Sequence, residues 1–141
     1  MQYIEINETF PFEVEKLFQY MEVHENLSNL FTPVKAKTIQ TGKTDKYGVG
    51  SVRSLQIAIE PPFEESITAY KKNELIEYKI TKGSPLKDHI GKIHFSSTEN
   101  GSALHYTIQF GSTIPFVDVI VKFFLEKSIR NGLKKLRNSS I

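Results

Sequence analysis

The sequence of 141 residues contains no cysteine and no tryptophan, and it has only a small excess of charge. The absence of cysteine excludes disulfide bonds and thiolate metal sites, and it favours a reducing cytoplasm as the location of the protein. The 18 Lys and Arg residues outnumber the 16 Asp and Glu residues by two, giving a net charge of +2. Because so small an imbalance gives no strong attraction to nucleic acid, we expect no nucleic-acid partner.

Long hydrophobic runs are also absent. The longest one, residues 114–125, is interrupted by Asp118 and Lys122, and it is shorter than the roughly 20 residues that span a bilayer. The first ten residues, MQYIEINETF, contain two glutamates and no basic segment, which is not typical of a secretory signal. We therefore expect a cytoplasmic protein with no integral membrane segment. Association with a membrane surface through the C-terminal helix stays open as an alternative.

The composition is that of a globular domain, with 39% apolar and 24% charged residues. The length predicts a single domain over residues 1–141 with one continuous core. His94 and His105 are expected to be diagonal neighbours on the polar face of one hairpin. Two exposed histidines without a third ligand do not make a metal site, so we expect neither a metal nor another cofactor.

The hydrophobic periodicity predicts the order of the elements. Residues 2–8 alternate as in a half-buried strand, residues 9–11 open a helix, and a second short helix covers about 25–31. From Val34 onward the period is two for about eighty residues. A long helix over 115–137 follows. The six strands of the alternating region, joined by short turns and hence antiparallel, are expected in residues 34–42, 50–59, 63–70, 74–81, 88–97 and 102–110.

Two turn signals predict the register of two hairpins. Asn100-Gly101 is typical of a type I′ turn, in which both central residues have positive φ, and Lys72-Asn73 is expected to form a second tight turn. The pairs that follow are Phe95 with Tyr106, Ile93 with Ile108, Gly91 with Phe110, Ala69 with Ile76, Ile67 with Tyr78, and Glu65 with Ile80. These pairs predict a sheet with one apolar face and one polar face.

The C-terminal helix is too apolar at its start for an ordinary surface helix. Nine of the twelve residues from Ile114 to Leu125 are Ile, Val, Leu or Phe, whereas a surface helix has one apolar stripe. A membrane, a partner chain, or the apolar face of the sheet with a cavity in between could cover them, and we favour the sheet. Phe124 is then expected in the core. Phe123 is expected at the cavity or its mouth, together with Phe116, Val119 and Ile120.

Several stretches resemble the START-like, plant-pollen-allergen-like helix-grip superfamily, and in particular its polyketide cyclase/dehydrase branch. They are NLFTPVKA, GVGSVRSL, FEESITAY, LIEYKITKGSPLKDHIGKIHF and ENGSALHYTIQF. The resemblance implies an α+β fold in which a curved antiparallel sheet of about seven strands wraps around a long C-terminal helix, with two short helices after the first strand. It also implies a deep cavity between the sheet and the helix, and a hydrophobic small molecule as the partner.

Strand alternation directs four polar side chains, those of Arg53, Glu65, Tyr78 and His89, toward the apolar face. A few polar groups in an apolar cavity are typical of a ligand site. Glu65, Tyr78 and His89 are also the candidates for catalysis, with Glu65 as a general base and His89 as an acid or base. The expected ligand-binding set is Arg53, Glu65, Tyr78, His89, Tyr106, Phe116, Ile120 and Phe123.

Alternatives remain for each of these residues. Arg53 and Glu65 could simply pair, because a buried charge needs a partner, yet a strict two-residue turn at Pro61-Pro62 would place them on opposite faces. His89 could lie at the rim of the cavity, in water. For the whole chain, the leading hypothesis is binding or transport of a hydrophobic small molecule. The alternatives are a polyketide cyclase/dehydratase-like enzyme and a protein-interaction module, including a homodimer.

Overall fold

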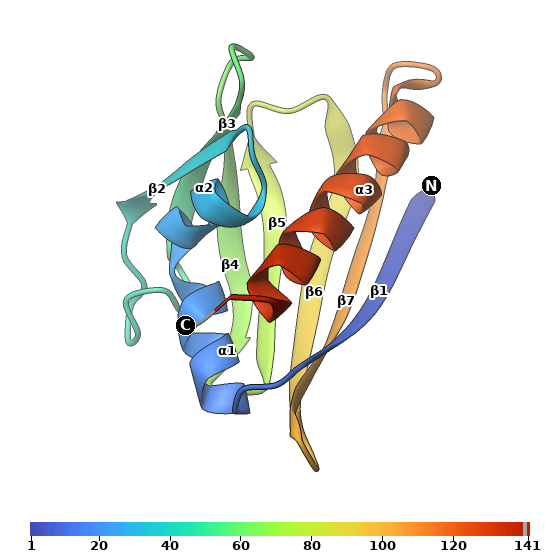
Figure 1. Ribbon diagram of the computed structural model, residues 1–141. Coiled ribbons are helices and arrows are strands. Elements are labelled where there is room, and N and C mark those ends of the chain that lie inside the picture. The colour runs from blue at the N-terminus through green and yellow to red at the C-terminus, as the bar shows by residue number, and fades with distance from the viewer. Residues whose placement is uncertain (140) are drawn as a thin grey trace.

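The computed structural model describes residues 1–139 and 141 (Figure 1). A seven-stranded antiparallel sheet, with the order β1-β7-β6-β5-β4-β3-β2, carries the helices on one face. The elements are β1 (Gln2–Phe10), α1 (Val14–Glu22), η1 (His24–Asn26), α2 (Leu27–Leu30), β2 (Val34–Gln40), β3 (Val52–Ile57), β4 (Phe63–Lys71), β5 (Leu75–Lys82), β6 (Leu86–Thr98), β7 (Gly101–Ser112) and α3 (Val117–Arg137). This is the helix-grip α+β fold, as predicted.

All six strands predicted in the alternating region are present, but the start of the first helix is wrong. Thr9 and Phe10 remain in β1 because they pair with Ala103 and Ser102 of β7, and α1 begins only at Val14. Cross-strand pairing therefore outweighs the local helix signal at residues 9–11. The second short helix is divided into the 3-10 helix η1 and the single turn α2.

The register of the β6–β7 hairpin differs from the prediction by two residues. Thr98 pairs with Gly101, so the turn consists of Glu99 and Asn100, and Ile93 faces Tyr106. Gly101 is already part of β7, where a Cβ atom would collide with the carbonyl oxygen of Phe10. The glycine is needed for this close approach, and a type I′ turn at Asn100-Gly101 is wrong.

A shift of two residues leaves every side chain on its predicted face. It does change the partners across the strands. Gly91 faces Ile108 of β7 instead of Phe110, and His94 lies directly opposite His105 rather than diagonally. The two imidazole rings stack with their centroids 6.3 Å apart.

The β4–β5 hairpin confirms two of its three predicted pairs, Ile67 with Tyr78 and Glu65 with Ile80. The third pair is wrong, because a register shift between Ile67 and Ala69 pairs Ala69 with Glu77. Such a bulge inserts one unpaired residue into one strand.

The C-terminal half of α3 is buried in the core, whereas its N-terminal half contacts the core through the half-buried Val121 and Leu125. Ile129, Leu133 and Leu136 are buried. Gly132 lies so close to the carbonyl oxygen of Leu30 in α2 that a Cβ atom would collide with it. In Figure 1, α3 crosses obliquely in front of the sheet. No helix in residues 1–139 is long and apolar enough to cross a membrane.

The N-terminal half of α3 corrects two predictions. We expected the sheet to cover its wide apolar face, and Phe124 to lie in the core. Instead, Phe124 is 63% exposed and Phe123 is 65% exposed. The first turns of α3 contact the rest of the protein through the hydrogen bond from Gln2 Nε2 of β1 to Asp118 Oδ2 and through Val121, and they leave the other apolar side chains uncovered. The other large apolar side chains exposed there are Phe116, Val119 and Ile120.

Candidate ligand-binding site

A cavity of about 720 Å³ lies between α3, the α2–β2 segment and the apolar face of the sheet. This volume is in the usual range for small-molecule sites, roughly 300–1,000 Å³. Its walls are mainly apolar, with Leu55 and Phe63 on the sheet side and Val121 and Leu125 on the helix side. The predicted site residues that line it are Arg53, Glu65, Tyr78, Tyr106 and Ile120.

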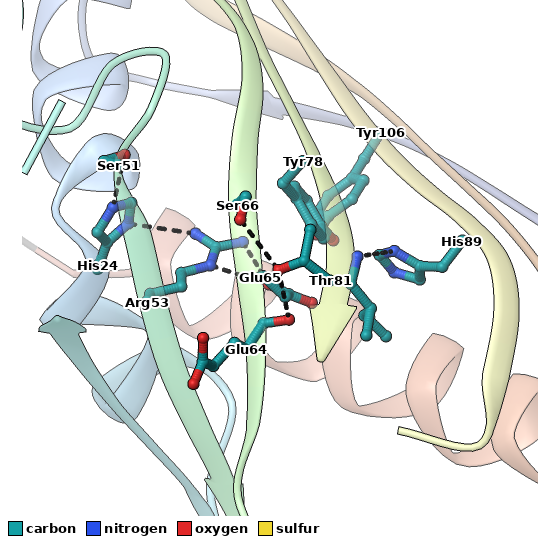
Figure 2. A network of polar contacts seen from close by, with 11 residues as sticks. His24, Ser51, Arg53, Glu64, Glu65, Ser66, Tyr78, Thr81, His89 and Tyr106 are labelled. Atoms are coloured by element: carbon teal, nitrogen blue, oxygen red, sulfur yellow. Dashed lines mark hydrogen bonds and ion pairs between the residues drawn. The ribbon is translucent and has the colours of Figure 1, made fainter. Parts of the chain in front are cut away.

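Arg53 and Glu65 form a buried ion pair at the polar end of this cavity. They are direct partners in the register of β3 and β4. Glu65 Oε1 accepts a hydrogen bond from Arg53 Nε at 2.9 Å and forms an ion pair with Nη2 at 2.7 Å (Figure 2). A strict turn at Pro61-Pro62 is wrong, since residues 58–62 separate the two strands and Ala58 has a positive φ of 52°. Both residues therefore pair and line the cavity.

The charge of Arg53 is retained in spite of its burial. Burial by itself would lower the pKa of Arg53, but the neighbouring carboxylate of Glu65 raises it above the ordinary value. The guanidinium group also lies 4.6 Å from the centroid of the Tyr78 ring, a distance suited to a cation–π interaction.

Tyr78 of β5 and Tyr106 of β7 bring two hydroxyl groups together beside this ion pair. The hydroxyls are hydrogen-bonded to each other (Figure 2). Burial raises the pKa of Tyr78 well above its ordinary value and that of Tyr106 to about 12, so both phenols are neutral at neutral pH. Gly91 of β6 provides the necessary space, because a Cβ atom there would overlap the ring of Tyr78.

His24 and Ser51, which the sequence did not indicate, hold Arg53 in place through a chain of hydrogen bonds. Arg53 Nη1 donates to His24 Nδ1 at 3.4 Å, so the proton of the neutral imidazole is on Nε2, which donates to Ser51 Oγ at 3.2 Å. Burial and the charge of Arg53 lower the pKa of His24 to about 3. His24 belongs to η1, outside every strand, so the alternation that identified Arg53 gave no signal for it.

His89 is buried but does not line the cavity, and the rim position considered for it is wrong. Its side chain points inward in phase with Gly91 and Ile93, as strand alternation predicts, although the register of β6 and β7 shifts between Lys87 and Ile90. Its Nδ1 accepts a hydrogen bond from the backbone N–H of Ile80 at 3.1 Å, and burial lowers its pKa. This hydrogen bond uses the acceptor nitrogen of His89 and links β6 to β5.

The aromatic residues of α3 exchange their expected places. Phe124 lines the cavity together with Ile120, whereas Phe116 and Phe123 are exposed and lie outside its lining. The rings of Phe123 and Phe124 contact each other edge to face, with centroids 5.5 Å apart. Consecutive helical residues point about 100° apart, which is why only one of them faces the cavity.

The second carboxylate oxygen of Glu65 has no hydrogen-bond donor in the described part of the chain. The hydrogen bond and the ion-pair contact from Arg53 both end on Oε1, and no described residue donates to Oε2. Nor is Oε2 sealed in protein, because every fully buried polar side-chain atom in the described part of the chain has a partner. That part also contains no group of three His, Asp or Glu residues able to hold a metal ion.

A curved antiparallel sheet, a long C-terminal helix across it, and an apolar cavity with a polar end define the helix-grip class of proteins. Residues 1–140 match the family described as polyketide cyclase/dehydrase and lipid transport, and the chain belongs to that family. No curated protein matches the chain.

Solved structures share the fold at low sequence identity. A START superfamily protein from Mycobacterium smegmatis has a TM-score of 0.78 at 10% identity, with 96% of this chain and 94% of that one covered. The protein XoxI from Bacillus cereus has a TM-score of 0.75 at 15% identity, covering 97% and 94%. The Aha1 dimer from Colwellia psychrerythraea has 0.70 at 15% identity, covering 98% and 95%. Such low identities establish similarity of fold alone.

Proposed function

We propose that this protein binds and carries a hydrophobic small molecule of the lipid, polyketide or aromatic type in the cavity between the sheet and α3. The observation that carries the proposal is the cavity itself, about 720 Å³ with mainly apolar walls and a polar end formed by buried side chains. Apolar walls provide affinity, and a few fixed polar groups orient the ligand.

The polar end is better suited to binding than to acid–base catalysis. The carboxylate of Glu65 is paired with Arg53, and His89 is engaged with the backbone of β5. The raised pKa values of Tyr78 and Tyr106, caused first by burial, keep the phenols protonated. These groups hold fixed hydrogen-bonding positions, as expected in a carrier.

The proposal can be tested by native mass spectrometry of the purified protein, followed by organic extraction, and by titration with an apolar fluorescent probe. We expect a retained ligand or saturable binding of the probe. Ser128 of α3 lines the cavity, so Ser128→Trp should fill it and abolish binding. Lys134→Trp, on an exposed position of the same helix, is the matched control. Absence of both a ligand and probe binding in the unaltered protein would exclude the carrier function.

A second candidate function is contact between two copies of the chain. The observation that favours it is the exposed apolar surface of α3 formed by Phe116, Val119, Ile120, Phe123 and Phe124, because contiguous exposed apolar side chains mark interaction surfaces. Sedimentation equilibrium should then show a dimer that Phe116→Ser with Phe123→Ser converts to a monomer. A native monomer at all concentrations would exclude this candidate.

A further inference from the structure

The polar end of the cavity has one hydrogen-bond acceptor that the protein does not use. Glu65 Oε2 receives no hydrogen bond from any described residue, although the side chain of Glu65 is only 9% exposed. Because Oε2 is not sealed in protein, it can accept a hydrogen bond from a molecule in the cavity, so this position favours a ligand that brings a donor. Figure 2 shows Glu65 with the carboxylate directed away from His24, on the side of the tyrosines.

The same end has one hydrogen-bond donor to spare. Two hydroxyl groups carry two protons, and the hydrogen bond between Tyr78 and Tyr106 uses one of them. Glu65, Tyr78 and Tyr106 line the same cavity, and the guanidinium paired with Glu65 lies 4.6 Å from the centroid of the Tyr78 ring, so the carboxylate and the hydroxyls share one end of the cavity. A ligand atom at this end therefore meets an acceptor and a donor side by side.

The positive charge at this end is already balanced by Glu65. Arg53 Nε donates to Glu65 Oε1, Nη2 forms an ion pair with the same oxygen, Nη1 donates to His24, and the Tyr78 ring lies against the guanidinium. Of its five N–H protons, one on Nη1 and one on Nη2 have no partner among the described residues. The ion pair sums to zero charge and the imidazole is neutral. The lysines in the cavity lining, Lys127 and Lys135, are on exposed positions of α3. A ligand carboxylate could meet them only with its head group in water.

We propose that the ligand is a neutral molecule with an apolar body and a hydroxyl group at its inner end, that is, an alcohol or a phenol. Its hydroxyl donates to Glu65 Oε2 and accepts the remaining tyrosine proton. This inference rests on the proposed carrier function and specifies the chemistry of its ligand. It predicts discrimination against fatty acids and other carboxylates of the same size, because their charge would face that of Glu65 with no cation to compensate it.

Four naphthalene probes of matched shape test this at pH 7: 2-naphthol, 2-methoxynaphthalene, 2-naphthoate and naphthalene. Since a hydrogen bond to a charged group contributes enough for about a 10- to 100-fold change in affinity, 2-naphthol should bind at least about tenfold more tightly than 2-naphthoate. The methoxy compound accepts but cannot donate, so it should bind more weakly than 2-naphthol. Equal affinities for 2-naphthol and 2-naphthoate would overturn the inference and leave the carrier function standing.

Two variants locate the effect. Glu65→Gln leaves the charge of Arg53 without its carboxylate, so the preference should invert toward 2-naphthoate. Tyr106→Phe removes only a hydroxyl, so it keeps the inference testable if the first variant does not fold. This variant should bind 2-naphthol about three- to tenfold more weakly and should bind naphthalene with unchanged affinity. A native preference for 2-naphthol that neither variant alters would place the hydroxyl elsewhere and overturn the inference. Failure of all four probes, including naphthalene, would overturn the carrier function as well.

Discussion

Arg53 and Glu65 face each other across β3 and β4, and a single carboxylate oxygen takes both the hydrogen bond from Nε and the ion-pair contact with Nη2. Arg53→Met should reduce the free energy of unfolding by about 3–5 kcal/mol, because it leaves a buried carboxylate without a counter-charge. Arg53→Met with Glu65→Leu should regain most of this loss. Denaturant unfolding of the two variants measures both effects, and a double variant less stable than the single one would contradict the explanation.

Gly91 and Gly111 differ in the space that a side chain would find at each position. Gly91→Val should reduce the free energy of unfolding by about 1–3 kcal/mol, because overpacking forces neighbours from their positions. The neighbour is the ring of Tyr78, not Phe110 as the sequence suggested. Gly111→Ala is the control, since its Cβ would lie 3.5 Å from the nearest atom of Lys87, an ordinary contact. An unchanged unfolding midpoint for Gly91→Val would show that Tyr78 is placed otherwise.

A comparison of alanine variants at Phe123 and Phe124 distinguishes a residue that lines the cavity from one that does not. Phe124→Ala should weaken binding of an apolar probe, because this side chain lines the cavity. Phe123→Ala should leave binding unchanged. Both side chains are more than 60% exposed, so each substitution should cost less than the roughly 3–5 kcal/mol of a buried phenylalanine. Paired unfolding and probe titrations check this, and a loss of binding in Phe123→Ala alone would reverse the assignment.

Stability should fall as the solution is acidified from pH 7.5 to pH 5. The pKa of His24 falls from 6.5 to about 3 on folding because of burial and the charge of Arg53. The unfolded chain therefore binds a proton in this window that the folded chain excludes, which costs about 2 kcal/mol at pH 5. The lowered pKa of His89 acts in the same direction.

His24→Gln removes the titrating group but keeps a donor for Ser51 and an acceptor for Arg53. Its free energy of unfolding should therefore vary less between pH 7.5 and pH 5 than that of the native protein, by about 2 kcal/mol. His94→Gln, on an exposed position of β6, is the control and should follow the native curve. Identical curves for His24→Gln and the native protein would show that His24 is not the group responsible.

The inward direction of Arg53, Glu65 and Tyr78 was predictable because strand alternation is a local property of the sequence. The inward direction of Gly91 and Tyr106 was also predicted correctly in spite of the error in the β6–β7 register, since a slip of two residues preserves the faces. The ion pair itself was not predictable. It depends on the five-residue connection between β3 and β4, whose conformation includes a positive φ at Ala58.

The rest of the site depends on tertiary contacts that no periodicity contains. His24 reaches Arg53 from η1 because the fold brings the α1–β2 segment behind β3. Phe124 is exposed, whereas Gly132, eight residues further along α3, lies against the carbonyl oxygen of Leu30. A glycine within a helical pattern gives no indication of which backbone it will touch.

The contact of Gly132 with α2 has a mechanical consequence for the width of the cavity. Because α3 is fixed near Leu133 and its first turns are held more loosely, by the Gln2–Asp118 hydrogen bond and the half-buried Val121, it resembles a lever with a short, buried arm and a long one. Ile120 lies about 20 Å along the axis from Leu133, so a tilt of about 5° would displace it by about 1.7 Å. The buried contacts of Ile129, Leu133 and Leu136 lie near the pivot and would hardly move. Such a tilt would change the width of the cavity without repacking the core.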